Sequence, residues 1–188
     1  MRARHAVVGM TAAGAVFVGL LASPAAAEET TCRGTLGRVT VDNLRVAQGG
    51  TCTLNGTYVK GTIKVERDAT LKASAVRVVG NVQGEGASLV SVAGGSTVGG
   101  SVQVVQGRAA AVSDSRINAD ILYDENRGAL KALRNVVGGN VQAFKNSGGV
   151  AISGNRIDGN LQCKENAPRP TGGNNVVQGN KEDQCARL

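Results

Sequence analysis

The sequence predicts an all-β fold, namely a single-domain parallel β-helix (β-solenoid) with three short strands in each coil. The first observation is a short motif that returns every 19 or 20 residues, a period typical of solenoid proteins. The other two are columns of apolar residues and columns of polar residues at fixed offsets from the motif. Together they predict about seven to eight coils, because the motif begins at Asp42, Gly61, Gly80, Gly100, Ala119, Gly139, Gly159 and Gly179.

Two apolar columns predict two of the strands in each coil. Residues two apart on a strand point to the same side, so a column that is always apolar faces the core. Two residues after the motif start, the column contains Leu44, Ile63, Val82, Val102, Ile121, Val141 and Leu161. Two residues before it, the column contains Val59, Val78, Val98, Ile117, Val137, Ile157 and Val177.

A third and looser set of inward-facing apolar residues predicts the third strand. It contains Leu54, Leu71, Val90 or Val92, Val112, Leu130, and Val150 with Ile152. Equivalent strands of successive coils would pair in parallel, so each coil adds about 4.8 Å and the rod is roughly 35 Å long. A left-handed helix would show strict six-residue hexads, which this sequence lacks. We therefore expect right-handed coiling, the general preference of parallel crossovers.

Two polar columns predict the corners between strands. Stacked side-chain amides and hydroxyls can bond to one another and to the backbone of a turn, so both columns indicate a structural role. The first contains Asn43, Thr62, Asn81, Ser101, Asp120, Asn140, Asn160 and Asn180. The second contains Ser96, Ser115, Asn135, Asn155 and Asn175.

Residues 1–27 are typical of a secretory signal peptide. Arg2, Arg4 and His5 precede an apolar run over residues 7–21, and Pro24 with three alanines follows before the chain turns acidic. The run is shorter than the roughly 20 residues that a spanning helix needs. We therefore expect residues 28–188 to form one β-helix domain that is secreted to the extracellular space and has no membrane span.

Four cysteines predict a disulfide at each end of the domain. Cys32 and Cys52 are 20 residues apart, and Cys163 and Cys185 are 22 apart, so each pair is about one coil apart. The Cα atoms of a disulfide lie within about 7 Å of each other, whereas any other pairing would cross most of the rod. After the last coil the charged residues 181–183 replace the apolar pattern. Capped ends of this kind predict a monomer rather than a filament.

The composition excludes several chemistries. The one histidine, His5, lies in the predicted signal peptide, which excludes Ser-His-Asp or Cys-His catalysis and histidine-ligated zinc in the mature chain. Its only aromatic residues are Tyr58, Tyr123 and Phe144, so there is no platform for stacking sugars or bases. Without the two signal-peptide arginines, 19 basic and 14 acidic residues leave a net charge of +5. This mild excess favours polyanions in general. We expect no metal, no cofactor and no nucleic-acid partner.

Three features of the sequence occur together. They are the repeated Gly-Asn-Val-Gln and Gly-Asn-Leu-Gln motifs, the predicted signal peptide, and the closing stretches 159–166 and 179–185. The chain resembles small secreted bacterial proteins with a right-handed parallel β-helix. The resemblance covers the mature chain. It implies a fold and a compartment but no particular activity, because the motifs are structural rungs.

These observations favour a secreted, non-enzymatic protein with a structural or surface-interaction role in the cell envelope or the extracellular space. An alternative is a binding module for an anionic cell-wall polymer or polysaccharide. Its candidate residues lie three positions before the motif start, where Arg77, Arg116 and Arg156 recur on every second coil. They would form a line with a spacing of about 9.6 Å. Such a line suits a repeating polyanion, because guanidinium groups pair well with phosphate or carboxylate.

A second alternative is a polysaccharide lyase or hydrolase, which needs carboxylates clustered across neighbouring coils. The repeat stacks Glu66 and Glu85 on adjacent coils, and two acids are too few for a calcium cage. Another corner mixes both signs of charge and contains Asp120, Asp124, Glu125 and Arg127. We therefore predict no catalytic residues. A further column, with Glu125, Lys145 and Glu165 on successive coils, predicts a surface ladder of alternating charges.

Overall fold

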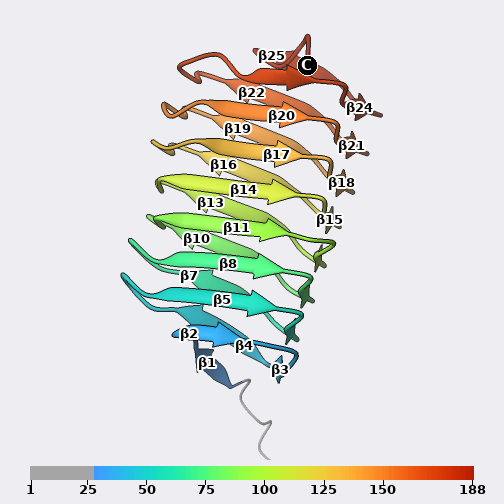
Figure 1. The fold of residues 1–188 in the computed structure, drawn as a ribbon. Coiled ribbons are helices and arrows are strands. Elements are labelled where there is room, and N and C mark those ends of the chain that lie inside the picture. Colours follow the sequence, from blue (N-terminus) through green and yellow to red (C-terminus); the bar gives the residue numbers. More distant parts are fainter. Residues whose placement is uncertain (1–27) are drawn as a thin grey trace, which may run out of the picture.

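The computed structural model describes residues 28–188, which form a right-handed parallel β-helix of eight coils (Figure 1). The nearer strands in Figure 1 run from left to right, the farther strands run from right to left, and the chain climbs from blue to red. These directions define a right-handed coil. The fold class, coil length and handedness predicted from the sequence are therefore confirmed. The predicted signal peptide, residues 1–27, lies outside the described residues.

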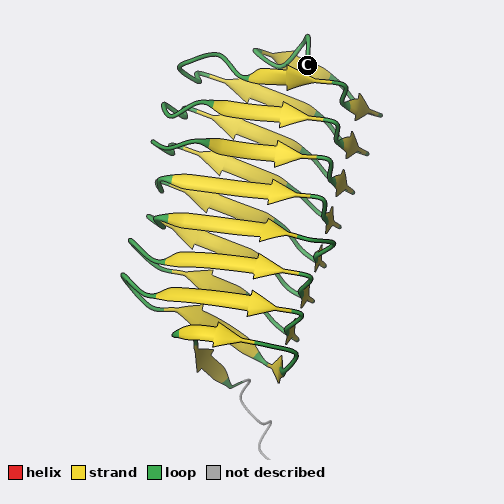
Figure 2. Cartoon of the chain, in the orientation of Figure 1, coloured by secondary structure: helices red, strands yellow, loops and turns green. Residues whose placement is uncertain are grey.

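Every regular element of residues 28–188 is a strand, and loops connect the strands (Figure 2). Residues 28–188 contain no helix that is long and apolar enough to cross a membrane.

The strands form three parallel sheets, which we call A, B and C. Sheet A contains β1 (Glu29–Thr31), β4 (Asn43–Val46), β7 (Ile63–Val65), β10 (Val82–Glu85), β13 (Val102–Val105), β16 (Ile121–Asp124), β19 (Val141–Phe144), β22 (Leu161–Lys164) and β25 (Lys181–Asp183). Sheet B contains β2 (Gly34–Leu36), β5 (Thr51–Asn55), β8 (Thr70–Ser74), β11 (Leu89–Ala93), β14 (Ala109–Ser113), β17 (Leu130–Leu133), β20 (Val150–Ser153) and β23 (Thr171–Gly173). Sheet C contains the two-residue strands β3 (Thr40–Val41), β6 (Tyr58–Val59), β9 (Arg77–Val78), β12 (Thr97–Val98), β15 (Arg116–Ile117), β18 (Val136–Val137), β21 (Arg156–Ile157) and β24 (Val176–Val177).

Strand pairing confirms the first two predicted apolar columns. In sheet A, Val102 pairs with Ile121 and Ile121 pairs with Val141, and all three side chains are fully buried. In sheet C, the second residue of each strand faces the core, and in the last coil Val177 is only half-buried. These columns form two continuous walls of the core.

The looser set predicted for the third strand faces the core as expected, but it is divided between two inward columns of sheet B. Leu54 pairs with Ala73, whereas Leu71 pairs with Cys52, so Leu54 and Leu71 belong to different columns. The two columns are buried from Cys52 to Val150 and from Leu54 to Ile152. Alanine interrupts the larger residues at Ala110 in one column and at Ala73 and Ala132 in the other, so a search for larger apolar residues finds neither column complete.

Sheet A also contributes a second inward column that the sequence pattern did not indicate. Its members differ in size, because Val104, Tyr123 and Ala143 pair on successive coils. The ring of Tyr123 is fully buried, and its hydroxyl donates a hydrogen bond of 2.7 Å to the carbonyl of Lys131. Burial raises the pKa of Tyr123 far above its usual range, so the phenol stays protonated. The small side chain of Ala143 beside it accommodates the ring.

The first polar column forms an unbroken ladder at the corner between sheets C and A. At each step from Asn43 to Asn180, the backbone N–H of one coil donates to the side-chain oxygen of the preceding coil. For example, the N–H of Asn160 lies 2.8 Å from Oδ1 of Asn140. The ladder satisfies corner N–H groups that a sharp turn would leave without partners. The predicted structural role is confirmed.

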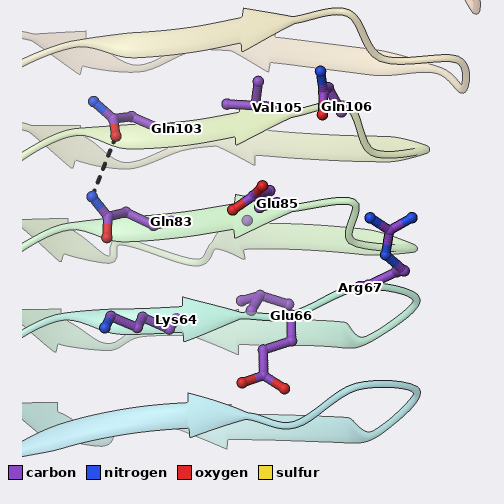
Figure 3. Close-up of a pocket in the computed structure, with 10 residues that line it drawn as sticks. Lys64, Glu66, Arg67, Gln83, Glu85, Gln103, Val105 and Gln106 are labelled. Atoms are coloured by element: carbon purple, nitrogen blue, oxygen red, sulfur yellow. Dashed lines mark hydrogen bonds between the residues drawn. The ribbon is translucent and has the colours of Figure 1, made fainter.

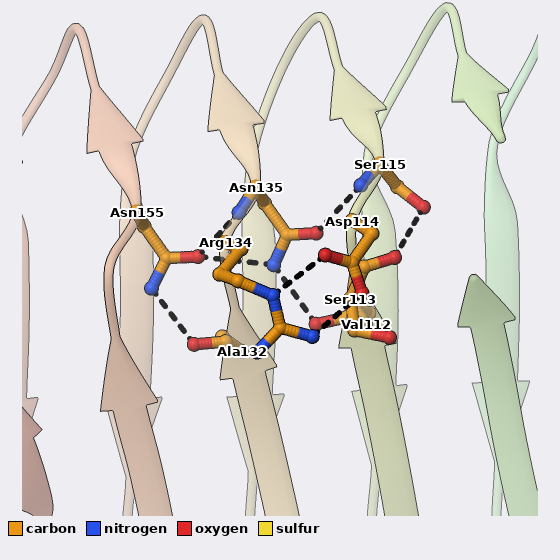
Figure 4. A network of polar contacts seen from close by, with 8 residues as sticks. All are labelled: Val112, Ser113, Asp114, Ser115, Ala132, Arg134, Asn135 and Asn155. Atoms are coloured by element: carbon orange, nitrogen blue, oxygen red, sulfur yellow. Dashed lines mark hydrogen bonds and ion pairs between the residues drawn. The ribbon is translucent and has the colours of Figure 1, made fainter. Parts of the chain in front are cut away.

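The second polar column forms a buried ladder at the corner between sheets B and C (Figure 4). Oδ1 of Asn155 accepts from the N–H and Nδ2 of Asn135 at 2.9 and 3.0 Å. Nδ2 of Asn155 donates to the carbonyl of Ala132 at 2.7 Å and to Asn175 at 2.9 Å. On the exposed side of this corner, Arg134 and Asp114 make two parallel hydrogen bonds of 2.6 and 2.7 Å.

A third ladder, which the sequence analysis missed, occupies the corner between sheets A and B. Asn126, Asn146 and Asn166 are buried, and each donates from Nδ2 and accepts at Oδ1 in the pattern of the second ladder. Gln184 continues this ladder at the end of the chain, where its Oε1 accepts from the N–H of Asn166 at 2.9 Å. The signal was present as asparagine at steps of 20 residues.

The first ladder explains the motif glycine. A Cβ built on Gly159 would lie 2.6 Å from Oδ1 of Asn140, too close for any real side chain. Among the residues that begin the motif, Ala119 is the one alanine. The polar residue of the preceding coil is here Ser101, whose side chain is shorter than that of asparagine and leaves more room for a Cβ. The glycine is therefore required by the polar side chain packed against it from the preceding coil.

Both predicted disulfides are present and fasten the two ends of the rod. The Cα atoms of Cys32 and Cys52 are 5.6 Å apart, and those of Cys163 and Cys185 are 5.2 Å apart. All four cysteines are buried. The pairings follow from the coil length, because residues one coil apart in sequence lie one strand spacing apart in space.

Replacing Val141 with aspartate should abolish folding of the rod, because the carboxylate would have no partner in an apolar column. The expected loss is more than about 4 kcal/mol in the free energy of unfolding. The matched control is Gln142→Asp on the same strand, where the side chain points outward and the melting temperature should change little. A soluble Val141→Asp protein with an unchanged melting curve would show that this column is not the core.

Replacing Asn155 with alanine should lower the free energy of unfolding by about 2–4 kcal/mol, because the N–H of Asn135 and the carbonyl of Ala132 would lose their buried partners. Denaturant unfolding measures this loss. The exposed Asn118→Ala is the control and should stay within about 0.5 kcal/mol of the parent. Equal effects of the two substitutions would contradict a stabilising role for the ladder.

Candidate functional site

The three candidate arginines lie on sheet C, where the first residue of each two-residue strand faces solvent. Strand pairing aligns Arg77, Thr97 and Arg116, and the line continues through Val136 to Arg156. The predicted alignment is therefore correct. The three arginines, which we call the arginine stripe, recur on every second coil at a spacing of about 9.6 Å.

The guanidinium groups of the arginine stripe are exposed and have no acidic partner in the part of the chain that the structure describes. Among residues 28–188, no ion pair within 4.0 Å includes Arg77, Arg116 or Arg156. The residues between them, Thr97 and Val136, have short uncharged side chains. Arg77 also lies over the ring of Tyr58, with its Cζ atom 5.5 Å from the ring centroid. This cation–π contact holds the first guanidinium against the sheet.

The acidic residues on the same face are engaged elsewhere. Asp42 forms an ion pair of 2.9 Å with Lys60, and the hydrogen bond from Lys60 lowers the pKa of Asp42. Asp158 accepts a hydrogen bond of 3.0 Å from Gln178. The positive charge of the arginine stripe is therefore not cancelled at contact distance by its own face.

The stacked carboxylates Glu66 and Glu85 do not act as a pair. Figure 3 shows Glu66 turned away from Glu85 toward the preceding coil. There its oxygens accept from the N–H of Gln48 at 2.9 Å and from Arg45 at 3.1 Å. These two donors lower the pKa of Glu66, so it stays ionised and unsuited to donating a proton.

The mixed corner of Asp120, Asp124, Glu125 and Arg127 is also divided among separate roles. Asp120 belongs to the first ladder and accepts from the N–H of Asn140 at 2.7 Å. Glu125 accepts from Gln106 at 2.9 Å and lies 3.7 Å from Lys145, and both contacts lower its pKa. No group of three or more possible metal ligands occurs in the part of the chain that the structure describes.

The predicted charge ladder is present only at its first step. Lys145 pairs with Glu125, but Glu165 instead lies 4.0 Å from the neighbouring Lys164. Gln106, Glu125, Lys145 and Glu165 all have positive φ values between 52° and 57°. Each of these left-handed residues directly follows the end of a strand of sheet A.

The structure places a groove on sheet A that sequence reasoning did not identify. Two adjoining hollows of 760 and 430 Å³ share Arg67, Glu85 and Gln106. The first reaches Lys64, and the second reaches Arg127 and Lys145, so the groove crosses five coils. Left-handed corner residues such as Gln106 and Lys145 form part of its lining, and no motif in the sequence encodes the groove.

Comparison with known proteins adds no assignment: no family model, curated protein or solved structure matches this chain. Any function must therefore be argued from the geometry of its surfaces.

Proposed function

We propose that this protein is a secreted, non-enzymatic rod with a structural or surface-interaction role in the cell envelope or the extracellular space. We further propose that the rod interacts with anionic polymers, such as a cell-wall polymer or an acidic polysaccharide, through the arginine stripe. One observation carries the proposal: strand pairing aligns three exposed guanidinium groups along the rod, and no acidic residue among residues 28–188 pairs with them.

The chemistry of the stripe matches a repeating polyanion. A guanidinium group presents several N–H donors in a plane and stays charged at all physiological pH values. One exposed contact of this kind is weak, about 0.2–1 kcal/mol. Three contacts on one rigid line act together, because binding the first anionic group holds the next one near its partner. The two disulfides support a secreted location, since such bonds persist in oxidising compartments.

The carboxylates favour a non-enzymatic role. A lyase or hydrolase site needs an acid and a base that converge on one bond. Here the carboxylate of Glu66 is already occupied by Arg45 and Gln48, and Glu125 by Gln106 and Lys145.

Replacing Arg77, Arg116 and Arg156 together with glutamine should weaken binding to an acidic polysaccharide by about tenfold at moderate salt, the sum of three exposed ion pairs. The measurement is retention of the purified protein on immobilised acidic wall polymer and polysaccharide at low and moderate salt. The variant should melt like the parent, because none of the three side chains faces the core.

The matched control is the triple variant Lys72→Gln, Lys131→Gln, Arg169→Gln, which removes the same charge from exposed positions outside the stripe. It should retain most of the binding. Equal losses in the two variants would show that net charge alone acts, as would parental binding that vanishes at moderate salt. No binding by the parent would leave only the structural role.

A further inference from the structure

The groove on sheet A has unsatisfied charges of both signs. Glu66 and Glu125 are compensated by Arg45 and by Lys145, respectively. Four other charged groups line the groove and take part in no ion pair within residues 28–188: Lys64, Arg67, Glu85 and Arg127. All four side chains are exposed, and Figure 3 shows Arg67 reaching toward the coil that carries Glu85.

These four charges form a fixed pattern along the rod. Lys64 and Arg67 share one coil, Glu85 lies on the next coil, and Arg127 lies two coils beyond Glu85. At about 4.8 Å per coil, the coil of Lys64 and Arg67 and the coil of Arg127 are about 14 Å apart along the rod axis, and the coil of Glu85 lies about 5 Å from the first. A ligand that satisfies the pattern carries two anionic groups with a cationic group between them.

We propose that the groove binds an extended peptide segment with a basic residue flanked by two acidic residues. An extended chain advances about 3.3 Å per residue, so acidic residues four positions apart span the two positive positions. Side chains at alternate positions share one face, which places a lysine between them opposite Glu85. This site is on a different sheet from the arginine stripe and does not depend on the proposed function.

The lining of the groove favours a peptide over a polysaccharide. No aromatic ring is among the residues that line the two hollows, so a sugar ring would have nothing to stack on. The amides of Gln83 and Gln103 face the hollow, and within residues 28–188 their one side-chain hydrogen bond is a long mutual one of 3.4 Å. They can exchange it for the N–H and C=O groups of a peptide backbone.

The probe is a fluorescein-labelled peptide, Asp-Ala-Lys-Ala-Asp, whose binding to the purified protein is followed by fluorescence anisotropy at moderate salt. Glu85→Gln should weaken binding about fivefold, and replacing the peptide lysine with norleucine should have the same effect. The two changes together should weaken it no further than either alone, because they remove the same contact. Arg67→Gln combined with Arg127→Gln should also weaken binding.

Two controls separate the groove from general charge. Asp124→Asn removes a carboxylate from the same sheet but outside the groove, and the triple glutamine variant removes the arginine stripe. Both should bind the peptide like the parent. The proposal is overturned if the parent does not bind, if Asp124→Asn weakens binding as much as Glu85→Gln, or if an amino-sugar polymer binds through Glu85 and the peptide does not.

Discussion

The structure depends on one constraint, which is that from Asn43 onward each strand pairs with the strand that follows it by 19 or 20 residues. Parallel pairing then places equivalent residues of successive coils next to each other on all three sheets. The three ladders of polar side chains maintain this register at the corners. Each asparagine both accepts from the backbone of a neighbouring coil and fills the turn, so a coil of a different length would leave buried N–H groups without partners.

The same register governs the core. The largest core side chain, the ring of Tyr123, pairs with the small Ala143 on the next coil. The motif glycine follows the same logic, since the space that its Cβ would need is taken by the polar side chain of the preceding coil. Side-chain size is thus set by the neighbouring coil as much as by the local strand.

Register also turns each outward column into a straight line of chemical groups. Short corners leave no long loops over the described surfaces, so specificity has to come from such lines and the shallow hollows between them. The arginine stripe on sheet C presents one sign of charge at regular intervals. The groove on sheet A presents both signs at unequal intervals, so the two faces suit ligands of different chemistry.

The sequence by itself determined the fold class, the coil length, the two disulfides and the alignment of Arg77, Arg116 and Arg156. All of these follow from the repeat, because a fixed period in sequence becomes a fixed position in space. Only the tertiary structure decided with which residues the polar side chains form hydrogen bonds and ion pairs. Glu66 and Glu85 lie in the same column, but Glu66 accepts a hydrogen bond from Arg45 of the preceding coil and therefore points away from Glu85. The groove likewise depends on left-handed corner residues such as Gln106, whose side-chain direction no repeat period specifies.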